Sequence, residues 1–112
     1  MRKSYPTTPD GRYFVAKNRL WRCTDPRLDE TTRRDWVSEL MSARRAVRDA
    51  GDEAQTHAAR ARVQTAKTAL GERGPVWWDD DAPDETGCAP ANTRYAAWWR
   101  SLAPADRASG QD

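Results

Sequence analysis

Four basic side chains and three aromatic rings lie within twelve residues, "RYFVAKNRLWRC" at positions 12–23. Such cations can neutralise phosphates while an exposed ring stacks on a base, which suits single-stranded nucleic acid or RNA loops. The predicted residues of this nucleic-acid site are Arg12, Lys17, Arg19, Arg22 and Trp21. In the alternative interpretation, the rings form a wall of the core and the arginines lie along it, meeting acidic residues from the end of the chain. We favour the core for Trp21, so nucleic-acid binding is our second hypothesis.

Two pairs of adjacent tryptophans indicate another kind of binding. They are Trp77 with Trp78 and Trp98 with Trp99. Adjacent side chains on a strand or helix cannot all face one way, so one ring of each pair is a candidate for exposure, and Trp is enriched at binding hot spots. The alternative, in which both rings of each pair are buried in the core, is about equally favoured. We predict a non-catalytic protein-interaction or accessory module, whose partner is another protein or a second copy of the chain.

The motifs of common catalytic and metal sites are absent from the sequence. There is no phosphate-binding glycine loop, no HExxH, no nucleophile elbow and a single histidine, His57. Nothing in the spacing brings Cys23 or Cys88 to that histidine as a nucleophile. Structural zinc needs about four ligands, and the acidic segment 79–85 lacks the spacing of a calcium loop. We therefore expect no enzymatic activity, no metal and no cofactor.

The net charge of +2 is distributed unevenly along the 112 residues. Residues 1–28 contain seven Lys or Arg against two Asp, whereas residues 75–112 contain three against seven Asp or Glu. An anionic partner could be attracted to the basic part, or the two ends could attract each other within the fold, which is the simpler interpretation. Arg44, Arg45 and Arg48 form a further basic patch, but Asp49 and Asp52 dilute it, so we interpret it as a solvated face.

Hydropathy and cysteine content bear on the compartment. No apolar run approaches the roughly 20 residues that cross a bilayer, and the chain begins with polar residues. We expect a soluble, cytoplasmic protein without membrane contact. Cys23 and Cys88 should then be free thiols, with a disulfide between them as the alternative.

The element that must position the basic residues is a β-hairpin over about residues 12–23. A two-residue loop at Lys17-Asn18 would pair Phe14 with Trp21, and a three-residue loop would pair Tyr13 with Trp21. We predict the three-residue loop, because it avoids a left-handed conformation at Lys17. In that register one face carries Tyr13, Val15 and Trp21, and the other carries Arg12, Phe14, Leu20 and Arg22.

Two helices should follow. Asp29 as N-cap and apolar residues spaced by three or four predict a helix over about 30–50, closed by Gly51. Asp52 and Gln55 resemble a capping box, which predicts a second helix over about 53–70. The apolar stripes are Trp36, Leu40, Ala43, Val47 and Ala50 on the first helix and Ala59, Val63, Ala66 and Leu70 on the second. These helices should form an antiparallel hairpin.

The last third of the chain completes the predicted fold. Residues 71–75 break the second helix, and a Trp-rich loop and a short helix capped by Asn92 or Thr93 occupy residues 76–102. The tail, residues 103–112, should be frayed. We predict one α+β domain over residues 1–102, in which the N-terminal β-hairpin and the C-terminal Trp-rich segment pack on the antiparallel two-helix hairpin.

Several blocks of the chain resemble a group of short, uncharacterised bacterial proteins that consist of one small domain. The blocks are "YPTTPDGRYFV", "LWRCTDP", "ELMSARRAV", "ALGERGPVWW" and "NTRYAAWW". The resemblance spans most of the chain and implies family membership, but no established activity. Some members are labelled "biopolymer transporter Tol", which the sequence does not support, because no membrane anchor or transport element is recognisable in it. The segment "DETGCAP" departs from the pattern of the group.

Overall fold

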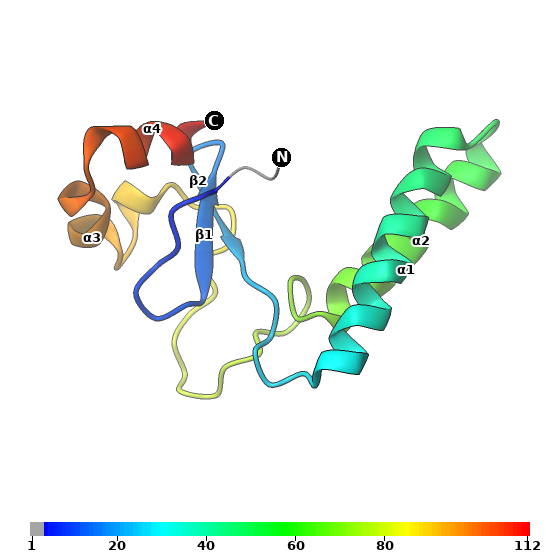
Figure 1. Ribbon diagram of the computed structural model, residues 1–112, viewed down its shortest axis with the longest axis horizontal. Coiled ribbons are helices and arrows are strands. Elements are labelled where there is room, and N and C mark those ends of the chain that lie inside the picture. The colour runs from blue at the N-terminus through cyan, green and yellow to red at the C-terminus, as the bar shows by residue number, and fades with distance from the viewer. Residues whose placement is uncertain (1–3) are drawn as a thin grey trace. The chain divides into compact units, whose positions relative to one another are not determined.

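The computed structural model describes residues 4–112, which form two compact units (Figure 1). Residues 4–23 and 80–112 make up the first, here called the hairpin unit, and Thr24–Asp79 make up the second, the helical unit. The predicted α+β class is confirmed, since a β-hairpin and a pair of packed helices are both present. Packing of the β-hairpin and the Trp-rich segment on the helical hairpin, within one domain over 1–102, stays a prediction.

The β-hairpin consists of β1 (Tyr13–Ala16) and β2 (Arg19–Arg22) in antiparallel pairing. The predicted three-residue loop is wrong, because Lys17 and Asn18 both adopt left-handed conformations, with φ of 54° and 59°, and form a two-residue turn. A turn of this hand matches the twist of the two strands, which offsets the strain at Lys17. Phe14 is therefore paired with Trp21.

This register also corrects the predicted faces of the hairpin. Opposed residues share a face, so Leu20 and Arg22 lie with Tyr13 and Val15, and all four are buried. Trp21 lies on the other face, where it is 37% exposed. The core of the hairpin unit therefore rests on one face of the hairpin, and a basic residue, Arg22, is part of that buried face.

Irregular segments cover both edges of the two-stranded sheet. Along β1, the amide of Val15 donates to the carbonyl of Pro6 (2.9 Å), and the amide of Thr8 donates to Tyr13 (2.8 Å). Along β2, the amide of Leu20 donates to the carbonyl of Cys88 (2.9 Å). Backbone groups that an edge strand would leave open are thus paired within the unit.

The end of the chain is helical and packed. A 3₁₀ helix, η1 (Pro90–Asn92), precedes α3 (Ala96–Ser101) and α4 (Pro104–Gln111). The predicted short helix is present, but it begins after Tyr95 and neither Asn92 nor Thr93 caps it. The predicted frayed tail is wrong: Gly110 of α4 is buried, and a Cβ built on it would lie 3.0 Å from Trp99 and 3.2 Å from Val15. Only glycine permits so close an approach.

The helical unit is built on α1 (Glu30–Asp49) and α2 (Glu53–Ala69), which pack against each other. The predicted N-caps are confirmed, since the carboxylate of Asp29 accepts from the amide of Thr32 and that of Asp52 accepts from Gln55 (2.8 Å). The buried residues on the predicted stripes are Leu40, Ala43, Ala59, Ala66 and Leu70. Three of them are alanines, which allow the two helices to approach closely.

The segments through which the chain enters and leaves the helical unit lie next to each other. The amide of Asp25 donates to the carbonyl of Leu70 (2.8 Å), and the hydroxyl of Thr24 donates to the carboxylate of Glu72 (3.0 Å). Gly71 has a φ of 80°, and a Cβ built on it would lie 2.9 Å from the Cβ of Asp25. These contacts fix the base of the helical hairpin.

Candidate functional site

Two of the four predicted nucleic-acid-binding cations are engaged by carboxylates of the C-terminal segment. Arg12 forms an ion pair with Asp80 and lies 3.9 Å from Asp10. Arg22, whose side chain is 3% exposed, lies 4.0 Å from Asp84. Both guanidinium groups therefore hold together segments of the hairpin unit that are far apart in sequence.

A hydrogen-bond network next to Arg12 was not foreseen from the sequence. The carboxylate of Asp10 accepts from the hydroxyl groups of Tyr95 and Thr8, both at 2.7 Å, and from the amide of Arg12 at 3.1 Å. Burial raises the pKa of Asp10, but these bonds outweigh it and bring the pKa below its usual range. Burial raises the pKa of Tyr95, and the bond to Asp10 raises it further.

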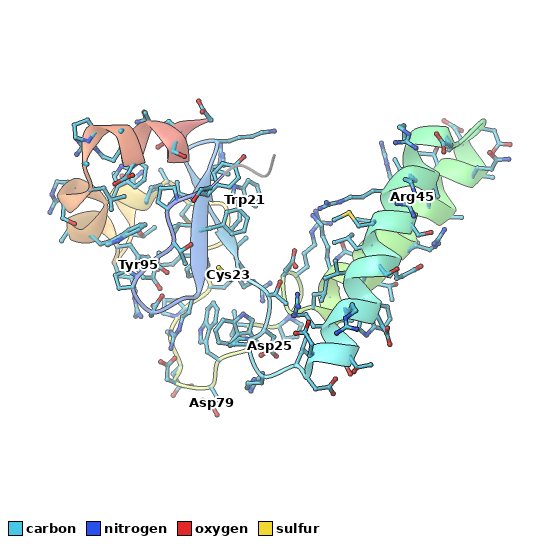
Figure 2. All side chains as sticks on the ribbon, in the orientation of Figure 1. Trp21, Cys23, Asp25, Arg45, Asp79 and Tyr95 are labelled. Carbon is cyan, nitrogen blue, oxygen red and sulfur yellow. The ribbon has the colours of Figure 1, made fainter. Side chains whose placement is uncertain are left out.

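The other two predicted cations remain exposed. Lys17 and Arg19 line a hollow of about 470 Å³ at the hairpin turn, together with Cys88 and Asn92. Arg19 also donates to the carbonyl of Gly87 (2.7 Å). Trp21 lies in the same unit (Figure 2). Its indole N–H donates to the carbonyl of Ala16 (2.8 Å), which fixes the ring over the end of the hairpin. Of the predicted nucleic-acid site, the open part thus consists of Lys17, Arg19 and Trp21.

The two Trp pairs lie in different units, and each pair has one buried ring. Trp78 is 8% exposed and Trp99 is 6% exposed, whereas Trp77 and Trp98 are half-buried. The ring centroids are 5.1 Å apart in the first pair and 6.2 Å apart in the second. Among the four predicted partner-binding residues, Trp77 and Trp98 therefore keep accessible ring surface.

Trp98 faces a hollow of about 210 Å³ between the N-terminal segment and the C-terminal helices. This hollow is called the Trp98 hollow. Its apolar walls are the rings of Tyr5 and Trp98 with Pro6 and Leu102, and its polar lining includes Asp106 and Ser109. Asp106 forms no ion pair with any residue in the range 4–112. The hollow thus combines aromatic surface with an exposed carboxylate.

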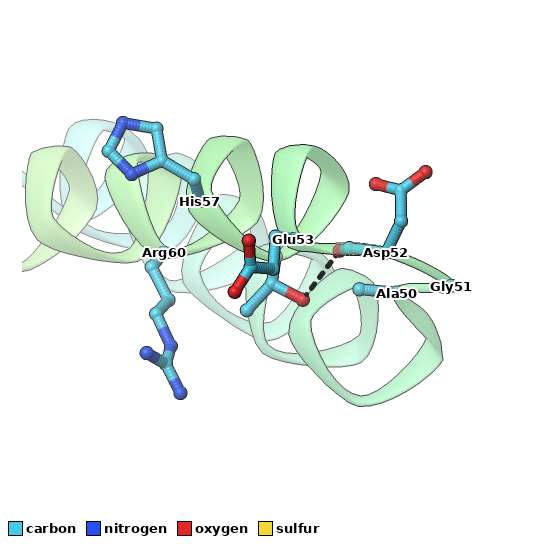
Figure 3. A pocket seen from close by; sticks show the side chains of 7 residues that line it. Ala50, Gly51, Asp52, Glu53, His57 and Arg60 are labelled. Atoms are coloured by element: carbon cyan, nitrogen blue, oxygen red, sulfur yellow. Dashed lines mark hydrogen bonds between the residues drawn. The ribbon is translucent and has the colours of Figure 1, made fainter.

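A wider hollow, of about 610 Å³, lies where α1 passes into α2 (Figure 3). Asp52 caps α2 here, and its carbonyl accepts from the hydroxyl of Thr56 (2.9 Å). His57 and Arg60 extend from α2 in opposite directions. His57 and Arg60 do not converge on one point, and the polar groups of Asp52 and Thr56 form hydrogen bonds within α2 itself.

The remaining candidates for chemistry are the two cysteines and any group of possible metal ligands. Cys23 and Cys88 do not form a disulfide. Among residues 4–112, no three side chains of His, Cys, Asp or Glu gather in a way that could hold a metal ion. No helix in this described range combines the length and the apolar character needed to cross a membrane.

The chain has no significant match among protein-family models, curated proteins or solved structures. Membership of the group of short bacterial proteins that its blocks resemble thus stays a prediction.

Proposed function

We propose that the protein is a non-catalytic interaction module that binds a basic side chain of a partner protein in the Trp98 hollow. The observation that supports this most directly is the combination of two aromatic rings, Tyr5 and Trp98, with the carboxylate of Asp106, which forms no ion pair within residues 4–112. A lysine or arginine side chain has the matching chemistry, because it joins an apolar stem to a cationic head. The stem would lie against Leu102, and the head would contact ring surface and the carboxylate.

The size of the Trp98 hollow favours a single side chain. Pockets for drug-sized ligands measure roughly 300–1,000 Å³, whereas this hollow has about 210 Å³. One lysine or arginine side chain of a partner would fill a hollow of this size.

One wall of the hollow, the N-terminal segment, is already fixed in the free protein. The hydroxyl of Ser109 in α4 donates to the carbonyl of Ser4 (2.7 Å), and the ring of Tyr5 lies 5.8 Å from that of Phe14. The carbonyl of Pro6 is bound by β1. A preformed wall lowers the entropy lost on binding, which strengthens a contact as small as one side chain.

The test uses NMR of the indole N–H groups of the ¹⁵N-labelled protein, titrated with N-acetyl-arginine amide. We expect the indole signal of Trp98 to shift saturably, and we expect N-acetyl-norleucine amide, which has a stem but no charge, to bind more weakly. Asp106→Asn should weaken the arginine titration, while Trp21→Leu removes an exposed ring outside the hollow and should leave it unchanged. Equal binding of the norleucine compound, or a Trp98 signal that does not move, would refute the proposal.

A second candidate function, nucleic-acid binding, is favoured by the exposed cations at the hairpin turn. Lys17 and Arg19 line one hollow, and Trp21 lies on the same face of β2 as Arg19. Saturable quenching of Trp fluorescence by single-stranded DNA, weakening steeply with salt and lost in Arg19→Gln, would support this function. No quenching at low salt would exclude it.

A further inference from the structure

Charges in the helical unit are sorted into paired and uncompensated groups. Residues 24–79 contain ten Lys or Arg and ten Asp or Glu, so the unit carries no net charge. Arg62 pairs with Glu39 across the two helices (2.9 Å), and Arg33 pairs with Glu30 along α1 (2.6 Å). Five cations of this unit form no ion pair with any of the described residues, 4–112: Arg44, Arg45, Arg60, Lys67 and Arg73.

Three of these five cations, Arg44, Arg60 and Arg73, surround one hollow on the helical hairpin. The hollow has about 450 Å³ and is lined by Arg44 and Val47 of α1, by Arg60, Val63 and Gln64 of α2, and by Arg73. It is called the arginine hollow. The guanidinium of Arg73 donates to the side-chain carbonyl of Gln64 (2.5 Å), which holds this arginine beside α2. Apolar surface from Val47 and Val63 thus lies among three arginines.

The charges of Arg44 and Arg73 also act on Lys67 of α2. Burial lowers the pKa of Lys67, and the charges of Arg73 and Arg44 lower it further, while Glu72 opposes them. Like charges held together in this way destabilise the free unit. An anionic group placed among them would relieve the repulsion, so any ligand that supplies one gains binding energy from the arrangement.

We propose that the arginine hollow is the docking site for an acidic amphipathic helix of a partner protein. A seam between two packed helices accepts a third helix, whose apolar residue would contact Val47 and Val63. Glutamate or aspartate side chains flanking that residue would meet the arginines, whose planar groups bind carboxylates in bidentate fashion. A nucleic acid would use the arginines but not the apolar surface, because no aromatic ring lines the hollow. The arginine hollow lies in the helical unit, is basic and would bind an acidic segment. The Trp98 hollow lies in the hairpin unit, carries a carboxylate and would bind a basic side chain.

The experiment measures fluorescence anisotropy of labelled synthetic peptides with the full-length chain. The main probe is longer than roughly 15 residues, so that its helix can form, and carries leucines along one face with glutamates beside them. We expect it to bind saturably, and we expect Arg44→Gln and Arg73→Gln each to weaken binding about fivefold. Arg45→Gln is the matched control, because it removes the same charge from α1 outside the hollow and should change the affinity less than about twofold.

Two further probes separate this site from general charge attraction. A peptide with alanine in place of leucine should bind more weakly if the apolar surface is used, and Val63→Thr, which keeps the shape of the side chain, should weaken the leucine peptide. Equal affinity for both peptides, equal loss in Arg45→Gln and Arg44→Gln, or displacement of the peptide by a single-stranded oligonucleotide at lower concentration would each overturn the proposal. Thermal unfolding of every variant, followed by circular dichroism, shows that the fold is retained.

Discussion

The two units use arginine in opposite ways. In the hairpin unit Arg12 and Arg22 form ion pairs with carboxylates that are distant in the sequence. These ion pairs connect separate segments of the unit. In the helical unit Arg44 and Arg73 line a hollow, and neither forms an ion pair with any residue of the described range 4–112. A cluster of basic residues in a sequence therefore does not locate the accessible positive charge. The positive charge of such a cluster stays accessible only where the fold brings no acidic side chains to it.

The largest expected effect concerns Arg22, whose ion pair with Asp84 should stabilise the fold. Replacing Arg22 by Gln removes the charge from a buried side chain and leaves Asp84 without its cation. We expect a loss of about 2–3 kcal/mol in the free energy of unfolding, because a partly desolvated ion pair is broken and buried polar groups lose their contacts. Arg44→Gln should change this free energy by less than about 0.5 kcal/mol. Urea unfolding followed by circular dichroism measures both, and similar losses would contradict the distinction between the two arginines.

A smaller effect is expected at Asp10, which links the hairpin to Tyr95. Asp10→Asn weakens the hydrogen bonds from Tyr95 and Thr8, and we expect it to cost about 1–2 kcal/mol at neutral pH. Because the pKa of Asp10 is lowered in the fold, its contribution is present above the unfolded pKa and is lost as the pH falls through the folded pKa.

The difference in unfolding free energy between the wild type and Asp10→Asn should therefore shrink below about pH 4. Urea unfolding at several pH values measures it. Tyr95→Phe serves as the control, since it removes the same bond from the other side. A difference that stays constant down to pH 2 would show that Asp10 does not act through its charge.

Local signals in the sequence predicted the helical unit well and the hairpin unit less well. Asp29, Asp52 and the apolar stripes act within a few residues, so caps and helices were predicted close to where they lie. The hairpin turn depends on a left-handed Lys17, and α4 depends on Gly110 packing against Trp99, which no local pattern reports. The twist of the two strands therefore accounts for the first error and tertiary packing for the second.

Of the two proposed sites, the sequence indicated one and gave no sign of the other. Adjacency of Trp98 and Trp99 indicated that one ring of the pair could remain accessible, and Trp98 lines the hollow that carries the proposed function. The arginine hollow escaped sequence analysis, because Arg44 and Arg73 are 29 positions apart and meet only when the helical hairpin closes. On α1, the basic patch that was interpreted as a solvated face contributes one member, Arg44, to this hollow.

The smallest expected effect concerns the uncompensated cations of the helical unit. Arg73→Gln removes a charge that lowers the pKa of Lys67, so we expect this pKa to rise, while burial keeps it from returning fully to the ordinary value. Because a lowered lysine pKa destabilises the fold most at pH values below the folded pKa, the variant should gain stability at neutral pH and lose that advantage as the pH rises through the pKa of lysine. NMR titration of the Lys67 side chain measures the shift. Arg45→Gln should leave the Lys67 pKa unchanged, and an equal rise in that variant would show that the cations act as a diffuse positive face rather than as one hollow.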